Sequence, residues 1–299
     1  MTSSPETINA SAAGVWTLGD LTVNRIGFGS MRLTQDGAAF GRSDSGDRDR
    51  ALAVLRRALE LGVNHIDTAA FYFSPLRSAN ELINSALAPY ADGLVITTKV
   101  GPGRDPSGSW IWATPEQLRG QVEENLRQLG RDHMDVVNLR IARSHGSKPV
   151  AEHFGALAEL REAGLIRHLG VSNVSPEQLA EARAIAPVVC VQNAYGLGSP
   201  AEDDAFVRFC GEQGIAFVPF YAIAGEGRES GASGVQDKAV LTVAHHHGAT
   251  PAQVRLAWTL HQGPHVLAIP GTGNPDHLAE NVAAGTLRLS DEDLALLAS

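Results

Sequence analysis

Ionised and amide side chains follow several apolar segments of this chain. Asp67 ends the apolar segment 63–67, and Lys99 ends the segment 94–99. More polar residues stand at the ends of later segments, namely Asn138, Arg140, Ser172, Asn173 and Gln192. Burial of an unpaired charge is costly, so a buried strand has little use for ionised side chains unless they act together or on a ligand. These residues are therefore the first candidates for the chemistry of the chain.

Alternating strand-like and helix-like segments would position these candidates. Eight segments are typical of buried strands, at 25–29, 63–67, 94–99, 134–139, 166–171, 188–191, 215–219 and 265–269. Helical patterns lie at 47–61, 79–89, 114–130, 150–164, from 175, and at 201–214, 235–247, 251–262, 275–284 and 291–297. This alternation predicts an α/β chain with parallel strands and helical crossovers. Eight such units in about 250 residues are typical of a (β/α)8 TIM barrel, whose active site lies at the carboxyl ends of its strands.

The beginning of the chain adds an N-terminal β-hairpin to the predicted barrel. Residues 15–23 predict two short strands around Gly19-Asp20. Residues 1–14 are rich in Ser, Thr and Ala, and we expect a flexible tail there. The main alternative is a doubly wound sheet, which normally has a glycine-rich turn between its first strand and helix. The segment 27–31 lacks a third glycine and no helix follows at once, so we predict a single barrel domain over 15–299.

The composition limits the partners of the chain. Its 299 residues include 24 Lys and Arg and 33 Asp and Glu, which gives a formal charge of −9. An acidic chain disfavours nucleic acid and membrane surfaces, because both are anionic. Two cysteines cannot form a disulfide framework, which favours a reducing cytoplasm, and residues 1–14 resemble neither a signal peptide nor a membrane span. We predict no metal site at His245-His246-His247, because consecutive helical residues point about 100° apart.

Several motifs, taken in order, resemble the aldo-keto reductase superfamily. The resemblance runs from about residue 16 to residue 289 and includes the hairpin. Its motifs are 62–69 leading to Tyr72, Lys99, 170–173, 191–193, and 269–272 running to Glu280 and Asn281. Each motif is weak alone, but their order at barrel positions makes the combination specific. The resemblance implies a (β/α)8 barrel that binds NADPH and transfers hydride from nicotinamide to an aldehyde or ketone.

The resemblance also implies the roles of the catalytic residues. Tyr72 matches the proton donor, Lys99 its activator and Asp67 the carboxylate that pairs with Lys99. Hydride attack makes an alkoxide that needs a proton near neutral pH, where a phenol with its usual pKa of about 10 is a poor acid. A buried ammonium nearby favours the phenolate, and a carboxylate compensates the charge of that ammonium. Proton donation of this kind contributes roughly 10²–10⁴-fold to the rate.

Arg140 departs from the family pattern. It stands where the family usually has a histidine that orients the carbonyl, at the end of Asn138-Leu139-Arg140. A permanent cation with several donors would bind the carbonyl oxygen or an adjacent anionic oxygen of the substrate. The tripeptide resembles the bacterial branch of the superfamily that contains pyridoxal reductases, which implies reduction of pyridoxal to pyridoxine. The segment 71–77 departs from that branch, where a shorter turn with Gly after the Tyr is usual.

The resemblance assigns a larger set of residues to the cofactor. Ser172, Asn173 and Gln192 would bond the nicotinamide carboxamide, and Phe220 would stack on the nicotinamide ring. The residues from other loops are Gly29, Ser30, Met31, Tyr221, Ile223, Gly225, Gly271, Thr272, His277, Glu280 and Asn281. Many members have Lys at the position of Gly271 and Arg at that of His277, where they read the 2′-phosphate. We therefore expect NADPH as the cofactor, with NADH also accepted because discrimination against it is weaker.

Three aromatic residues, Phe73, Trp110 and Trp112, are candidates for the substrate pocket. The alternative functions are a ketone or sugar-carbonyl reductase of secondary metabolism and a non-catalytic NADPH-binding subunit. The intact set of Asp67, Tyr72 and Lys99 disfavours the non-catalytic subunit. We expect a cytoplasmic monomer or weak homo-oligomer whose partner is a small carbonyl compound.

Overall fold

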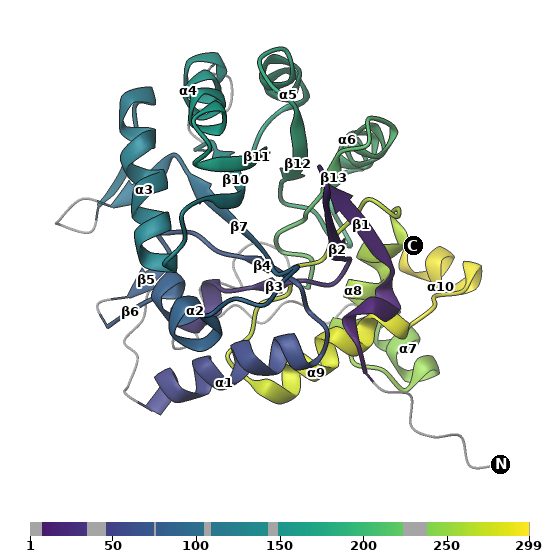
Figure 1. Cartoon of the computed structure of the whole chain (residues 1–299). Coiled ribbons are helices and arrows are strands. Elements are labelled where there is room, and N and C mark those ends of the chain that lie inside the picture. Colours follow the sequence, from purple (N-terminus) through teal and green to yellow (C-terminus); the bar gives the residue numbers. More distant parts are fainter. Residues whose placement is uncertain are drawn as a thin grey trace.

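A curled parallel sheet lies at the centre of the computed structural model, which describes residues 8–34, 46–74, 76–104, 109–142, 149–223 and 238–298. Seven strands are hydrogen-bonded in the order β13-β12-β11-β10-β7-β4-β3 (Figure 1). They are β3 (Phe28–Gly29), β4 (His65–Asp67), β7 (Val95–Val100), β10 (Met134–Arg140), β11 (Ile166–Ser172), β12 (Val188–Gln192) and β13 (Ala216–Phe217). Every neighbouring pair in this sheet is parallel, as the strand–helix alternation predicts.

An eighth strand position closes this sheet into a barrel. The segment 266–268 makes parallel bridges to both edges of the sheet. The backbone N–H of Leu267 donates to the carbonyl of Phe217 at 2.9 Å, and that of Ala268 donates to the carbonyl of Arg25 at 2.8 Å. A closed ring leaves no unpaired sheet edge. The predicted (β/α)8 barrel is therefore confirmed, with an eighth strand that pairs over only a few residues.

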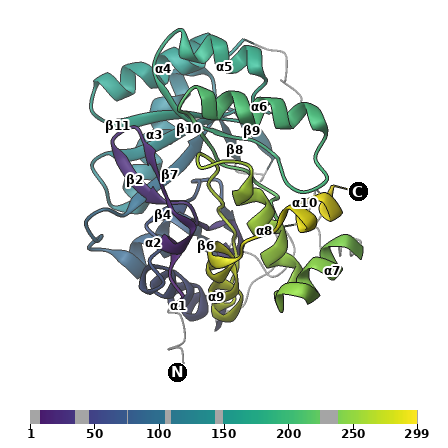
Figure 2. The ribbon, with the colours of Figure 1, turned by 90° about the vertical axis from the view of Figure 1, so that its right-hand side faces the viewer.

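Helices surround the barrel and follow the predicted segments within a few residues. They are α1 (Gly46–Glu60), α2 (Ala79–Leu87), α3 (Leu118–Leu129), α4 (Ala151–Glu162), α5 (Pro176–Arg183), α6 (Ala201–Glu212), α7 (Lys238–His247), α8 (Pro251–His261), α9 (Pro275–Ala283) and α10 (Asp291–Leu297). Short 3-10 helices are η1 (Ala10–Ala13), η2 (Met31–Thr34), η3 (Pro115–Gln117) and η6 (Ala284–Thr286). Figure 2 shows α7 and α10 beyond α8, and a hydrogen bond of 2.8 Å from His247 to Asp293 joins α7 to α10.

Local capping signals fix where several helices begin. Ser175 and Thr250 each form a capping box with the Gln three residues later, and Pro occupies the first helical position in both cases. Thr114 starts the 3-10 turn η3 in the same way, and α3 continues from it to Gly130, whose φ is 65°. A side-chain oxygen at the cap accepts from an otherwise unpaired N–H, and Pro loses no helical hydrogen bond there. These starts position the loops that lead into each helix.

The predicted N-terminal hairpin closes one end of the barrel. It is formed by β1 (Val15–Leu18) and β2 (Leu21–Asn24), which pair antiparallel. Leu18 and Val23 are fully buried and pack against residues near the starts of the barrel strands, including Val95. Asp20 in the turn bonds the guanidinium of Arg167 and the ring of His168, with closest distances of 2.6 Å to each. The carboxyl ends of the strands therefore form the open end of the barrel.

The expected flexible tail up to Gly14 is wrong for its last residues. Ala10–Ala13 forms the 3-10 helix η1, and Ala10 is fully buried. The backbone N–H of Ala10 donates to the carbonyl of Leu61 at 2.8 Å, and Arg288 donates to the carbonyl of Ala12. Residues three apart share one side of a 3-10 helix, so two small apolar side chains pack against the helices around the barrel. Small-residue composition alone did not indicate this packing.

Two small hairpins stand at the open end of the barrel. The pair β5 (Phe73–Ser74) and β6 (Arg77–Ser78) follows β4, and the pair β8 (Pro102–Arg104) and β9 (Trp110–Trp112) follows β7. Both hairpins therefore extend from the carboxyl ends of the strands that carry Asp67 and Lys99. They bring the candidate substrate residues Phe73, Trp110 and Trp112 to this end.

Candidate active site

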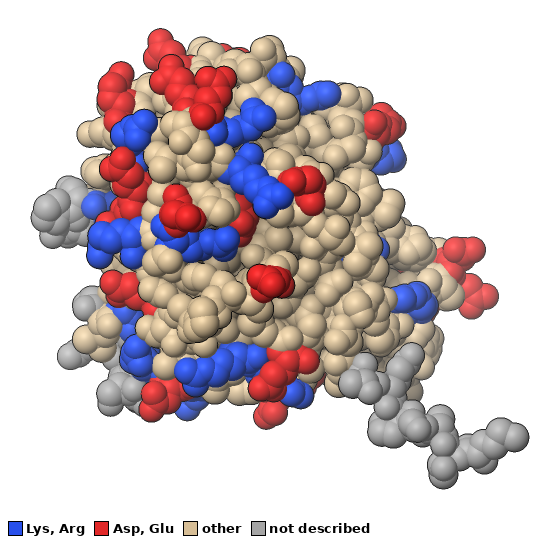
Figure 3. Space-filling view, in the orientation of Figure 1, with Lys and Arg blue, Asp and Glu red and all other residues tan. Residues whose placement is uncertain are grey.

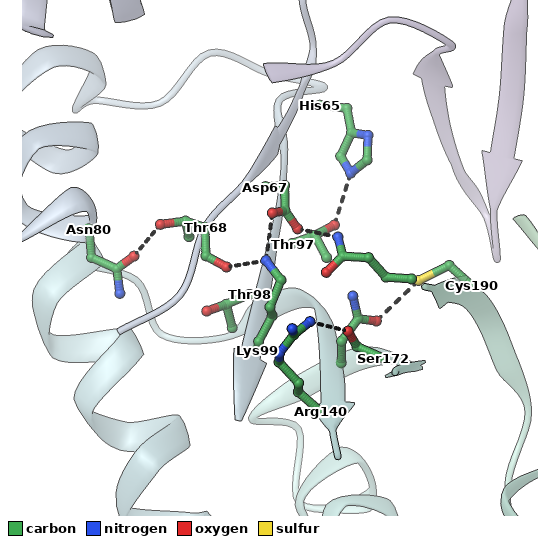
Figure 4. A network of polar contacts seen from close by, with 12 residues as sticks. His65, Asp67, Thr68, Asn80, Thr97, Thr98, Lys99, Arg140, Ser172 and Cys190 are labelled. Atoms are coloured by element: carbon green, nitrogen blue, oxygen red, sulfur yellow. Dashed lines mark hydrogen bonds and ion pairs between the residues drawn. The ribbon is translucent and has the colours of Figure 1, made fainter. Parts of the chain in front are cut away.

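The structure brings the strand-end candidates together at the open end of the barrel. Asp67 ends β4, Lys99 lies one residue before the end of β7, and Arg140 ends β10. Ser172 ends β11 and pairs in register with Arg140, and Gln192 ends β12 and pairs in register with Ser172. Parallel strands end at the same edge of a sheet, so residues far apart in the sequence converge there. Figure 4 shows Asp67, Lys99, Arg140 and Ser172 around one space.

Asp67 and Lys99 form a buried ion pair. Lys99 Nζ lies 2.5 Å from Asp67 Oδ1, and the two side chains are only 2% and 3% exposed. Lys99 Nζ also donates to the carbonyl of Thr68 at 3.0 Å, and Gln192 Nε2 donates to Asp67 Oδ2 at 2.8 Å. Burial by itself would lower the pKa of Lys99, but Asp67 and Tyr72 together raise it above its usual value. The ammonium therefore stays charged inside the barrel because both ions keep hydrogen-bond partners.

Tyr72 lies against this ion pair. Lys99 Nζ is 4.8 Å from the centroid of the Tyr72 ring, and the ring is half-buried. The Tyr72 backbone N–H donates to the carbonyl of Ala69, and its carbonyl accepts from Ala79. The Phe71 ring meets the Tyr72 ring edge to face with centroids 5.1 Å apart. The turn after β4 therefore fixes the phenol beside the ammonium, as the sequence resemblance implies for a proton donor.

Arg140 lies between a hydroxyl and an aromatic ring. Its Nη1 donates to Ser172 Oγ at 2.9 Å, and its Cζ lies 4.9 Å from the centroid of the Phe220 ring. Among the described residues, no carboxylate forms an ion pair with Arg140. A guanidinium stacked on an aromatic ring keeps its in-plane donors available. The site therefore contains a positive group with spare donors next to the Asp67–Lys99 pair.

Three predicted carboxamide-binding residues already make bonds within the protein. Ser172 accepts from Arg140, Asn173 Nδ2 donates to the carbonyl of Ile141 at 2.8 Å, and Gln192 Nε2 donates to Asp67. Asn173 has a φ of 61°, a left-handed conformation that a non-glycine residue adopts only where its surroundings hold it. Gln192 Oε1 is buried with no partner among the described residues. That acceptor is one observation that fits a bound carboxamide.

The other residues that the resemblance assigns to the cofactor come from three segments, at 29–31, 220–225 and 271–281. A Cβ at Gly29 would lie 2.6 Å from the carbonyl oxygen of Ile269, and one at Gly271 would lie 2.5 Å from that of Gly29. Only glycine allows this close approach of β3 to the eighth strand position. Ser30 Oγ next to it is buried without a partner in the described part of the chain. Met31 follows in η2, half-buried.

The remaining expected cofactor residues lie just before α9, within α9 and after β13. Thr272 Oγ1 accepts from the backbone N–H of Asn274, which in turn caps α9. On α9, His277 and Glu280 are exposed, whereas Asn281 is 5% exposed. Phe220 meets Tyr221 edge to face, with ring centroids 4.9 Å apart, and Ile223 packs partly buried against the core. The expected cofactor residue Gly225 lies outside the described residues.

The candidate substrate residues form an exposed aromatic group with two residues that sequence analysis did not single out for the pocket. Phe73, Trp110 and Trp112 are 38%, 47% and 37% exposed. Arg104 Cζ lies 4.4 Å from the centroid of Trp110 and 5.8 Å from that of Phe73. Phe71 joins Trp110 edge to face at 5.8 Å, so rings extend from Tyr72 to the rim. Their sequence positions could have indicated this, since Phe71 is adjacent to the expected proton donor Tyr72 and Arg104 precedes Trp110 and Trp112 in the same segment.

Comparison with known proteins decides the family. The model of the aldo/keto reductase family matches residues 25–299. The chain belongs to this family. Membership makes this aldo/keto reductase an oxidoreductase that acts on carbonyl compounds with a nicotinamide cofactor. The predicted superfamily is therefore confirmed.

Individual relatives cover nearly the whole of this aldo/keto reductase. Pyridoxine 4-dehydrogenase of Escherichia coli is 45% identical over 96% of this chain and 98% of its own length. An aldo-keto reductase of Klebsiella pneumoniae in complex with NADP and acetate is 28% identical, with a TM-score of 0.74 over 92% of this chain and 90% of its own. A thermostable aldo-keto reductase in complex with the inhibitor epalrestat is 29% identical, with a TM-score of 0.77 over 93% of this chain and 96% of its own.

The surface adds little to this assignment. On the face shown in Figure 3, Lys and Arg side chains are interspersed with Asp and Glu. Within the described residues, no helix is long and apolar enough to cross a membrane.

Proposed function

We propose that this aldo/keto reductase uses NADPH to reduce the aldehyde of pyridoxal, or of a closely similar aromatic aldehyde, to the alcohol. The observation that carries the proposal is Arg140, a cation without a carboxylate partner among the described residues, beside the Asp67–Lys99 pair. Pyridoxal has a phenolic oxygen next to its aldehyde, and a guanidinium can bind two adjacent oxygens. The 45% identity to a pyridoxine 4-dehydrogenase supports the same substrate class.

The cofactor fits the residues present. Nicotinamide, when bound, supplies the hydride that adds to the carbonyl carbon. The partnerless Gln192 Oε1 would accept from its carboxamide, and the buried Ser30 Oγ, which also lacks a partner among the described residues, would bond another polar group of the cofactor. The N-terminus of α9 and the nearby Thr272 would receive phosphate oxygens.

The residues of this chain would handle the proton. Arg140 would hold the carbonyl oxygen and the adjacent phenolate oxygen of the substrate, and so fix the aldehyde toward Tyr72. As negative charge develops on the carbonyl oxygen, the Tyr72 hydroxyl would donate its proton there. Lys99 would stabilise the phenolate that remains, because its ammonium lies 4.8 Å from the ring centroid and is kept charged by Asp67.

A substrate panel tests the proposal. We would follow NADPH oxidation with pyridoxal, benzaldehyde, a ketone and an aldose, using wild type and Tyr72→Phe. The expected result is the highest kcat/KM for pyridoxal in wild type, and a loss of about 10²–10⁴-fold in kcat in Tyr72→Phe with unchanged NADPH binding. A higher kcat/KM for the ketone or the aldose would replace pyridoxal by the alternative substrate class. Tight NADPH binding without turnover of any carbonyl would contradict the enzymatic role itself.

A further inference from the structure

The barrel interior is polar one layer below the Asp67–Lys99 pair. Side chains of a strand alternate between its two faces, so residues two positions before the site residues also point inward. These are His65 before Asp67, Thr97 before Lys99, Asn138 before Arg140 and Cys190 before Gln192. Each is at most 2% exposed. We call these four residues the inner polar layer; branched apolar residues usually fill this position in a barrel.

The inner polar layer is only partly hydrogen-bonded. His65 Nε2 and Thr97 Oγ1 are 3.1 Å apart, and Cys190 Sγ donates to Asn138 Oδ1 at 3.2 Å (Figure 4). Asn138 Nδ2 and His65 Nδ1 have no partner in the described part of the chain, and neither has Gln192 Oε1 in the layer above. A buried polar atom without any hydrogen-bond partner lowers the stability of the folded protein by about 1–3 kcal/mol. Three such atoms inside one barrel point to solvent held within it.

Gly170 brings Asn138 and the β12 residues together. Its strand, β11, lies between β10 and β12, and Gly170 pairs in register with Asn138 on one side and with Cys190 on the other. A Cβ at Gly170 would lie 2.0 Å from Asn138 Oδ1 and 2.6 Å from Cys190 Sγ. The Asn138 amide and the Cys190 thiol therefore occupy the space that a side chain would fill. No side chain of β11 separates Asn138 from β12 at this level.

The inner polar layer is neutral, but the charges of Asp67 and Lys99 act on its titratable groups. Burial lowers the pKa of His65 to about 4, while Asp67 raises it and Lys99 lowers it further. Burial also raises the pKa of Cys190 to about 12, again with Asp67 and Lys99 acting on the thiol. At neutral pH the layer therefore presents dipoles rather than charges to the ion pair above it. The orientation of those dipoles matters because they act in a low-dielectric interior.

We propose that an ordered water molecule lies between Asn138 and Gln192, accepts from Asn138 Nδ2 and donates to one lone pair of Gln192 Oε1, and that Asn138 thereby acts as a positioning residue for Gln192. An amide oxygen has two lone pairs, so the other stays available to the nicotinamide carboxamide. An amide can be turned so that either its NH2 or its oxygen faces a neighbour. The NH2 of Gln192 faces Asp67 at 2.8 Å. A water that donates to Oε1 secures this orientation, since a turned amide would set an oxygen against the carboxylate.

The first test is a high-resolution crystal structure of the wild-type protein at neutral pH. We expect one water within hydrogen-bond distance of both Asn138 Nδ2 and Gln192 Oε1. A direct bond between the two amides, or an empty space between them, would overturn the proposal. This measurement requires no turnover, so it is independent of the proposed function, which only the substrate panel can contradict.

The second test compares Asn138→Leu with Cys190→Ser. Both change the inner polar layer, but only Asn138→Leu removes the donor to the water. With the best aldehyde of the panel, we expect Asn138→Leu to lower kcat about tenfold and leave KM within about twofold, because Gln192 is free to turn. The alkaline limb of its kcat–pH profile should move to higher pH, since an oxygen turned toward Asp67 makes the phenol hold its proton more tightly. Cys190→Ser keeps a donor to Asn138 Oδ1 and should keep the wild-type profile.

Equal effects of the two substitutions would mean that the layer acts through packing alone, and would contradict the positioning role. Unchanged kinetics in Asn138→Leu would do the same. If Asn138→Leu does not fold, the wild-type crystal structure still decides whether the water is present.

Discussion

The guanidinium carbon of Arg140 lies 4.9 Å from the centre of the Phe220 ring, and its Nη1 donates to Ser172. The ring and the hydroxyl hold the cation at the end of β10, facing the same space as Lys99 (Figure 4). A histidine in this place would be charged only below its pKa, whereas the guanidinium is charged at every relevant pH. By the sequence resemblance, this fixed charge is where the site departs from the usual family pattern.

Arg140→His should therefore retain turnover but change substrate preference. We expect kcat/KM for pyridoxal to fall about tenfold to hundredfold, the range for a lost hydrogen bond to a charged group. Benzaldehyde lacks the neighbouring oxygen and should be affected less. Steady-state kinetics measure the ratio of kcat/KM for pyridoxal to kcat/KM for benzaldehyde in each protein. An unchanged ratio of the two kcat/KM values would show that Arg140 does not select the substrate.

Cofactor preference should be moderate. His277 is exposed and Gly271 has no side chain, so the 2′-phosphate would meet neither of the cations that many family members place there. We expect a higher kcat/KM with NADPH than with NADH, and measurable turnover with both. His277→Arg should raise the NADPH:NADH ratio about threefold to tenfold through a charge-assisted hydrogen bond. His277→Gln serves as the neutral control, and an NADH preference in wild type would refute the expectation.

The buried ion pair makes a clear prediction for stability. Lys99→Met leaves the Asp67 carboxylate buried without its cation, so the free energy of unfolding should fall by about 3–5 kcal/mol. Lys99→Met combined with Asp67→Leu removes both charges and should recover most of that loss. Neither variant should reduce an aldehyde at more than a small fraction of the wild-type rate. Urea unfolding measures the stabilities, and equal stability of Lys99→Met and wild type would argue against a charged pair.

His65 predicts how stability depends on acid. Its pKa is lowered from 6.5 to about 4, chiefly by burial, so between these values the unfolded chain binds a proton that the folded chain does not. The free energy of unfolding should therefore fall as pH falls through this window, by up to about 3 kcal/mol from this group. His65→Gln should show a smaller fall over the same window, although its stability at pH 7 is lower. Parallel pH dependences for the two proteins would disagree with a neutral buried His65.

Gly170 should tolerate no side chain. In Gly170→Ala the new methyl group would lie 2.0 Å from Asn138 Oδ1 and 3.0 Å from the Cys190 carbonyl oxygen, so the protein should lose about 1–3 kcal/mol of stability. Gly155→Ala is the matched control, because its Cβ meets nothing within 4 Å in helix α4. That control should gain about 0.5–1 kcal/mol from helix propensity. Thermal unfolding of both variants measures the difference.

Much of the barrel could be predicted because its signals are local. Thr114, Ser175 and Thr250 predict helix starts because each capping signal is complete within four consecutive residues. The apolar segments before Asp67 and Lys99 predict strands in the same local way. The ion pair itself followed only from the family resemblance, since 32 positions separate its members. Of the inner polar layer, only Asn138 was a candidate in the sequence, and its contacts could not be predicted because they depend on which residues of separate strands meet inside the barrel. The burial of Ala10 could not be predicted either, because its hydrogen-bond partner Leu61 is distant in the sequence.

The hairpin β1–β2 makes the two ends of the barrel unequal for any practical use of the protein. Val15 is 56% exposed and Asp20 lies in the turn that covers the closed end, away from the strand ends that carry Asp67, Lys99 and Arg140. A dye or a surface linker attached through a cysteine at Val15 would occupy the closed end only. The two native cysteines are buried, so such a label would react at the introduced site alone. An immobilised reductase tethered in this way presents its open end to the solution.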